Sequence, residues 1–355
     1  MALFSSLRKL LSGSAEPRTV GRTPSAGSAT HPPPAPGGAA TAPVSATSVA
    51  GPAMRSMEDA SAEWLRFSAR VFAVDRLRDV PPTAIEQTLM QRLQSQSGAQ
   101  WADQLPRLPA ILPQLMRLVR RDDVSAGELV TLLSRDPSLV GELMRLANSP
   151  RYRTGREITD LSSAIMVLGQ QGLNQLVMSV SMRPIFKQGK GRHSANAGTL
   201  LWDLSERIAF ATLRLSNAGD DEFAAYLAGI SSQLGLMALL RALDGMPSPL
   251  VPPMDREGLH RQLLPLASGW SAQIVQHWGF PARVGEALVP PARRSAEAAV
   301  LAQLVHQAQA VALRHLMQPG LQPAQLGDWS LSQQRCYADM AREFGEGRAA
   351  SGAQA

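Results

Sequence analysis

The feature that most constrains the fold of this 355-residue chain is a succession of apolar repeats at helical spacing, several of them opened by capping signals. Thr83 is followed three residues later by Glu86, the pattern in which each side chain bonds a free backbone N–H of the first helical turn. Asp136-Pro137 places a proline at the first helical position, where no backbone donor is needed. No run of period-two alternation is long enough to support a sheet. The sequence therefore predicts an all-α fold.

The apolar spacing and the turn residues predict many short helices with short connections. The expected ranges are 57–78, 84–96, 105–119, 125–134, 137–147, 161–169, 171–182, 197–216, 220–245, 257–265, 270–278, 281–288, 295–317 and 331–345. We expect a break at Gly169-Gln170-Gln171-Gly172, because glycines at such a point separate two helices. No tandem repeat is evident.

The N-terminal region has a composition unlike the rest of the chain. Residues 1–11 form a short amphipathic segment, for which a weak membrane-surface contact through residues 2–11 and a marginal helix that docks nowhere both stay open. Residues 12–55 are rich in Pro, Ala and Ser and predict a disordered linker. We expect a helical lead-in at 57–83, a main domain at 84–315, and a C-terminal helix with a disordered end at 316–355.

The charge distribution and the cysteine content indicate the cellular compartment and the class of binding partner. The net charge is +6, and five basic residues against one acidic residue in 1–57 account for +4 of it. The folded part is therefore nearly balanced, and we expect no nucleic acid partner. Uninterrupted apolar runs of transmembrane length and a secretory signal are absent from the sequence. The single cysteine, Cys336, excludes an internal disulfide and a Cys-based zinc site, so we expect a cytoplasmic protein. A redox or nucleophilic role for Cys336 stays open.

Several motifs occur in one order along residues 84–315. They are LPRLP, the Ser-Arg-Asp-Pro cap, LMRLANS, AIMVLG, LWDLSERIAFA, and IVQHWGFPARVGEAL. This series resembles the HDOD domain family, which is related to metal-dependent phosphohydrolases of the HD type. The resemblance implies a bacterial signal-transduction protein built from two helical sub-bundles, 84–190 and 197–315.

The resemblance also implies where a metal site would lie, and the residues there have the wrong chemistry. The first histidine of the HD pattern falls at Leu204, its central His-Asp pair at Ser232 and Gln233, and its late aspartate at or near Gln309. The lysine that usually follows the pair falls at Leu236. Leucine cannot bind a metal, and neutral serine and glutamine are poor substitutes for imidazole and carboxylate. We expect no metal, no cofactor and no catalysis, and we expect His306 to be packed or half-buried.

The leading hypothesis is therefore a non-catalytic regulatory or scaffold module that binds a protein partner or a small ligand in a groove between the sub-bundles. Its candidate contacts are Arg145 and Asn148 in the Leu-Ala-Asn-Ser motif, and an anion-binding patch of Arg151, Arg153 and Arg156. The alternative is a divergent HD-type phosphohydrolase that acts on nucleotides or cyclic dinucleotides with rearranged ligands. A third, weaker hypothesis is a nucleic-acid binder.

Overall fold

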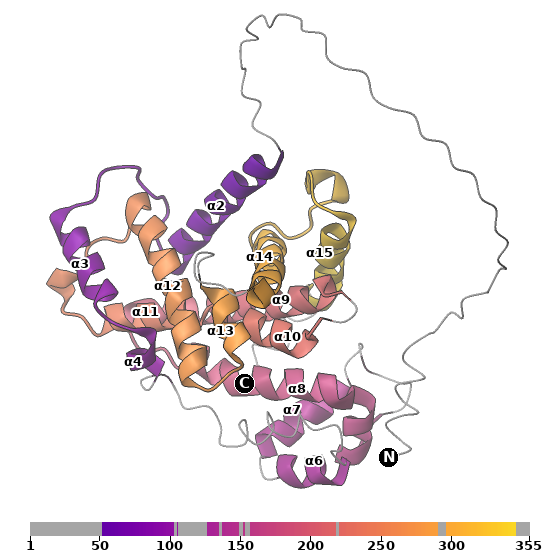
Figure 1. Ribbon diagram of the computed structural model, residues 1–355. Helices are drawn as coiled ribbons and strands as arrows, with labels where there is room; N and C mark the ends of the chain where they lie inside the picture. The colour runs from indigo at the N-terminus through magenta and orange to yellow at the C-terminus, as the bar shows by residue number, and fades with distance from the viewer. Residues whose placement is uncertain are drawn as a thin grey trace, which may run out of the picture. The chain divides into compact units, whose positions relative to one another are not determined.

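A computed structural model describes residues 52–102, 105, 126–134, 137–148, 152, 157–217, 220–289 and 296–345 (Figure 1). The amphipathic segment predicted at 1–11, nearly all of the linker predicted at 12–55, and most of the helix predicted at 105–119 lie outside these residues.

The described residues confirm the all-α prediction, since an isolated bridge between Arg78 and Arg256 is the sole β-type pairing among them. The helices are α2 (Pro52–Val71), α3 (Ala84–Gln94), α4 (Gly98–Ala102), α6 (Ala126–Leu133), α7 (Pro137–Ala147), α8 (Leu161–Lys187), α9 (Arg192–Leu215), α10 (Glu222–Ser231), α11 (Leu234–Asp244), α12 (Glu257–His277), α13 (Ala282–Leu288), α14 (Ala296–Met317) and α15 (Leu331–Phe344). Two short 3₁₀ helices, Ser248–Leu250 and Pro323–Gln325, join them.

The local capping signals are reproduced in the structure. The Thr83 N–H donates to Glu86 Oε2 at 2.6 Å, and the Glu86 N–H donates to Thr83 Oγ1 at 3.3 Å, which completes the predicted capping box of α3. Helix α7 begins at Pro137, as the sequence predicts. Gly169 has φ 64°, a left-handed conformation that interrupts α8 where a break is predicted.

Other helix boundaries are corrected by the structure. Helix α2 begins at Pro52, inside the predicted linker, because proline suits the first turn of a helix; it ends at Val71, just before Ala73 with φ 54°. The predicted helix 220–245 is broken at Ser232-Gln233 into α10 and α11. The helices predicted at 257–265 and 270–278 form one helix, α12, which continues through Pro265.

The helices form two packed groups, one of α6–α8 and one of α9–α14 (Figure 1). Helix α8 contacts both α9 and α10 and so joins the groups. Helices α3 and α4 pack on α12, so residues 84–102 belong with the second group, and assigning them to a first sub-bundle of 84–190 is wrong. The lead-in helix α2 lies against α9, α12 and α14.

One stretch, Glu222–Asp244, is long and apolar enough by composition to cross a membrane, but 94% of its most apolar window is buried inside the fold. It comprises α10 and α11, which pack against α9, α12 and α13. The leucines of α11 are buried because this helix is enclosed on several sides.

Candidate functional site

The break between α10 and α11 shapes a pocket of the second helix group. The Ser232 hydroxyl donates to the Gly229 carbonyl at 2.8 Å, which satisfies an acceptor at the end of α10. Ser271 of α12 bridges the break, because its hydroxyl donates to the Ser232 carbonyl at 2.9 Å and accepts from the Gly235 N–H at 2.8 Å. The break is therefore a fixed part of the fold.

Gly235 lets α11 approach α12 closely. A Cβ atom at this position would lie 1.8 Å from the Ala267 carbonyl oxygen, far inside van der Waals contact. The close approach places Leu236, the next residue, on the wall of the pocket beside α12.

The pocket has a volume of about 350 Å³, within the usual range for small-molecule sites. It collects three of the four positions that the sequence assigns to the former metal site, namely Ser232, Gln233 and Gln309. The remaining wall residues are Trp64, Leu65, Leu236, Arg261, Leu264, Pro265, Ala267 and Ser268. We call this cavity the neutral pocket.

The wall of the neutral pocket contains no carboxylate, imidazole or thiol among the residues that line it. Its single cation, Arg261, donates to Glu257 Oε1 through Nε at 2.9 Å and Nη2 at 2.5 Å. Across the described part of the chain, no group of three or more His, Cys, Asp or Glu residues could hold a metal ion. The pocket can offer hydroxyl and amide hydrogen bonds within a largely apolar enclosure.

Leu204, the fourth vacated position, is fully buried in α9 and does not line the neutral pocket. The structure thus brings together Ser232, Gln233 and Gln309 from α10–α11 and α14, and leaves Leu204 in the core.

Comparison with known proteins identifies the family. The sequence profile of the HDOD domain matches residues 105–289, just over half of the chain. The chain belongs to the HDOD domain family. The match includes the break at Ser232-Gln233, while Trp64 and Gln309 lie outside it.

Three further proteins are similar to parts of this chain. An uncharacterised protein of Treponema pallidum (strain Nichols) is 27% identical over 173 residues, 48% of this chain and 33% of that protein, so the match spans about a third of the relative. A crystal structure of an HDOD domain protein of unknown function from Geobacter sulfurreducens has a TM-score of 0.54 and 20% identity, covering 74% of this chain and 96% of that one. A candidate metal-dependent phosphohydrolase from Shewanella amazonensis SB2B has a TM-score of 0.52 and 16% identity, covering 74% and 100%. At these identities the two solved structures show a shared fold.

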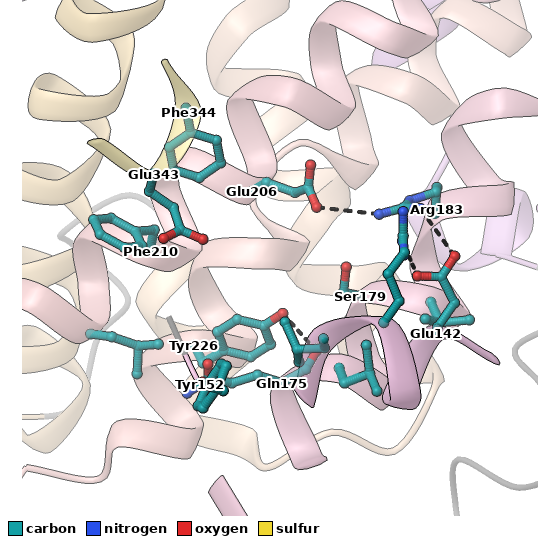
Figure 2. Close-up of a pocket in the computed structure, with 15 residues that line it drawn as sticks. Glu142, Tyr152, Gln175, Ser179, Arg183, Glu206, Phe210, Tyr226, Glu343 and Phe344 are labelled. Carbon is teal, nitrogen blue, oxygen red and sulfur yellow. Dashed lines mark hydrogen bonds and ion pairs between the residues drawn. The ribbon is translucent and has the colours of Figure 1, made fainter. Parts of the chain in front are cut away.

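A second pocket of the HDOD protein, of about 260 Å³, lies between the two helix groups (Figure 2). Its walls come from α7, α8, α9, α10 and the end of α15; we call it the inter-group pocket. Figure 2 shows Arg183 between two carboxylates, with Nη1 3.8 Å from Glu142 Oε1 and Nη2 3.6 Å from Glu206 Oε1. The Arg183 guanidinium also lies 5.6 Å from the Trp202 ring centroid, which anchors α8 to α9.

The opposite wall of the inter-group pocket is aromatic. Phe344 of α15 packs edge-to-face on Phe210 of α9, with ring centroids 5.6 Å apart. The Tyr226 hydroxyl donates to the Gln175 carbonyl at 2.8 Å, so its ring is fixed between α10 and α8 (Figure 2). This pocket therefore combines an ionic wall with an aromatic wall.

The residues predicted to contact a partner or ligand do not lie together at one site in the described structure. Arg145 lines the inter-group pocket, is largely exposed, and pairs with Glu142. Asn148 is occupied within the fold, because its amide nitrogen donates to the Ile158 carbonyl at 2.8 Å and its amide oxygen accepts from the Ile158 N–H at 2.8 Å. The patch of Arg151, Arg153 and Arg156 lies outside the described residues, although Tyr152, between the first two, lines the inter-group pocket.

The described histidines differ in burial, and the cysteine is buried. The prediction that His306 is packed is wrong: the residue is exposed, since it lies on the outer face of α14. His260 is buried, with Nδ1 2.7 Å from Ser68 Oγ of α2 and Nε2 3.0 Å from the Met254 carbonyl oxygen; burial lowers its pKa. Burial raises the pKa of the Cys336 thiol to about 12, so the group stays protonated at neutral pH.

Sequence reasoning missed the walls that come from outside the family motifs. Trp64 and Leu65 of α2 close the neutral pocket, and Glu343 and Phe344 of α15 close the inter-group pocket. The helical apolar pattern around these residues indicates that they pack, but it carries no signal about the surface on which they pack.

Proposed function

We propose that this HDOD protein is a non-catalytic regulatory module of a signalling system, acting in the cytoplasm by binding a protein partner or a small ligand. The observation that carries the proposal is the convergence of Ser232, Gln233 and Gln309 on one pocket whose wall holds no anionic or imidazole donor. Phosphoester hydrolysis of the HD type needs a cation to polarise the phosphate and activate a water molecule. Hydroxyl and amide groups alone supply too little negative charge to hold that cation.

The signalling part of the proposal follows from the HDOD family, and the binding part follows from the two pockets. The neutral pocket suits a small uncharged ligand, because its one cation is already paired. The inter-group pocket suits a partner, because it is open between α7, α8 and α15 and offers Arg145 at its rim. A ligand that binds between the two helix groups would bias their packing, which is how a binding module transmits a signal.

Metal analysis combined with an activity assay tests this proposal. Full-length protein purified without chelators should contain less than one equivalent of Mn, Fe or Zn. It should not hydrolyse bis(p-nitrophenyl) phosphate or a cyclic dinucleotide when Mn²⁺ is added. Stoichiometric metal together with turnover would instead establish a divergent phosphohydrolase.

A further inference from the structure

Two glutamine amides of the neutral pocket have unused hydrogen-bonding capacity. Gln233 is 3% exposed, and its Nε2 donates to Ser232 Oγ at 3.2 Å, while its Oε1 bonds to no other described residue. Gln309 is half-buried and has no hydrogen-bond partner within the described ranges. A primary amide presents a donor and an acceptor side by side, so both groups match a ligand edge that carries the same pair.

Helix α12 contributes a proline to the lining of the pocket. Pro265 has no backbone N–H, so the carbonyl of Arg261, four residues earlier, receives no helical hydrogen bond. Both residues line the pocket.

The rest of the lining is mainly apolar. Trp64 of α2 is half-buried and lines the cavity, and it packs edge-to-face on Phe67 with ring centroids 5.7 Å apart. Leu236 and Leu264 line the cavity beside it. An indole ring next to aliphatic side chains favours a planar ring as the occupant.

The charge of the pocket gives no preference for an anion. Arg261 is the one cation in the wall, and two of its donors are held by Glu257. The amides of Gln233 and Gln309 and the indole of Trp64 are left to recognise the ligand, and all of them are uncharged.

We propose that the neutral pocket binds the base of a nucleoside, an uncharged planar heterocycle with adjacent donors and acceptors. Gln233 and Gln309 bond its edge, as glutamine amides bond base edges in nucleic acid complexes, and Trp64 contacts its face. This inference rests on the proposed function, because a metal in the same cavity would displace the ligand.

Two of the three proposed ligand contacts lie outside the matched family segment. Trp64 and Gln309 both lie beyond residues 105–289, whereas Gln233 lies within them.

Isothermal titration of full-length, metal-free protein with adenosine, guanosine, cytidine and uridine tests the inference. At least one nucleoside should bind saturably with one site per chain. The 5′-monophosphate of that nucleoside should bind with an affinity within about fivefold of the nucleoside's own. Arg261 is exposed and already paired with Glu257, so it should add little binding energy for the phosphate. Gln309→Leu should weaken binding about tenfold or more, since it removes one donor–acceptor group.

The matched control is Gln303→Leu, the same change at an exposed position of α14. It should bind like the wild type. Absence of saturable binding by every nucleoside in metal-free protein overturns the inference and leaves the non-catalytic function standing. Binding that survives Gln309→Leu, or that requires the phosphate, also overturns it. Bound metal with phosphoester turnover overturns the proposed function itself.

Discussion

His315 makes the stability of this HDOD protein depend on pH in a way that can be calculated from the structure. The residue lies on α14, is 4% exposed, and accepts a hydrogen bond at Nδ1 from Arg207 Nε at 3.3 Å. Protonation at Nδ1 would break this bond and place two cations side by side. Two effects lower the pKa of His315 from 6.5 to about 4: burial, which is the larger effect, and the positive charge of Arg207.

The sign of the effect follows from the direction of the pKa shift. The unfolded chain takes up a proton near pH 6.5, while the folded chain takes it up near pH 4. The stabilisation is therefore complete above pH 6.5 and is lost as the pH falls from 6.5 towards 4. The full shift corresponds to at most about 3 kcal/mol. Because pH 5 still lies above the folded pKa of about 4, roughly 1–2 kcal/mol of it is lost between about pH 7.5 and about pH 5.

Urea unfolding followed by circular dichroism at those two pH values measures the effect. His315→Gln keeps an acceptor for Arg207 but cannot be protonated, so it should lose roughly 1–2 kcal/mol less than the wild type on acidification. His306→Gln, at an exposed position of the same helix, should behave like the wild type. Equal acid-induced losses in wild type and His315→Gln would refute the reasoning.

Three further predictions concern single positions. Gly235→Ala should destabilise the fold by about 3 kcal/mol in urea unfolding, because its Cβ would meet the Ala267 carbonyl. The control is Gly269→Ala, where the added Cβ meets nothing within 4 Å and the change should be neutral or stabilising. Equal effects of the two substitutions would argue against close packing of α11 on α12. Asn148→Ala should cost about 1–3 kcal/mol by the same assay, because it strips both backbone groups of Ile158 of their partners, and an unchanged midpoint would contradict that role. Cys336 should react with a thiol reagent in denaturant and resist it in the native state, and rapid native labelling would contradict the buried, protonated thiol.

Local parts of the fold follow from the sequence because their causes are local. Thr83 and Glu86 cap a helix three residues apart, and the left-handed Gly169 interrupts α8 within one segment. The break at Ser232-Gln233 was not predicted, because the apolar pattern runs through it without interruption. Its stabilising partner, Ser271, is 39 residues away, so no window of local sequence contains the cause.

The candidate site likewise has parts that the sequence predicts and parts that depend on tertiary contacts. The family motif order points to Ser232, Gln233 and Gln309, and all three line one pocket in the structure. Leu204 belongs to the same pattern but lies in the core, since its leucine side chain packs with apolar neighbours. The contribution of Trp64 depends on how α2 docks on α12 and α14, which is a tertiary contact without a sequence motif.

The proposed function requires that the neutral pocket does not hold a divalent cation. Titration of full-length protein with Mn²⁺, followed by the electron paramagnetic resonance of the free ion, tests it most directly. The free-ion signal should rise in proportion to added Mn²⁺ from the first addition, with no saturable site. A one-to-one site that removes the free signal, and that is abolished by Gln233→Leu or Gln309→Leu, would contradict the account.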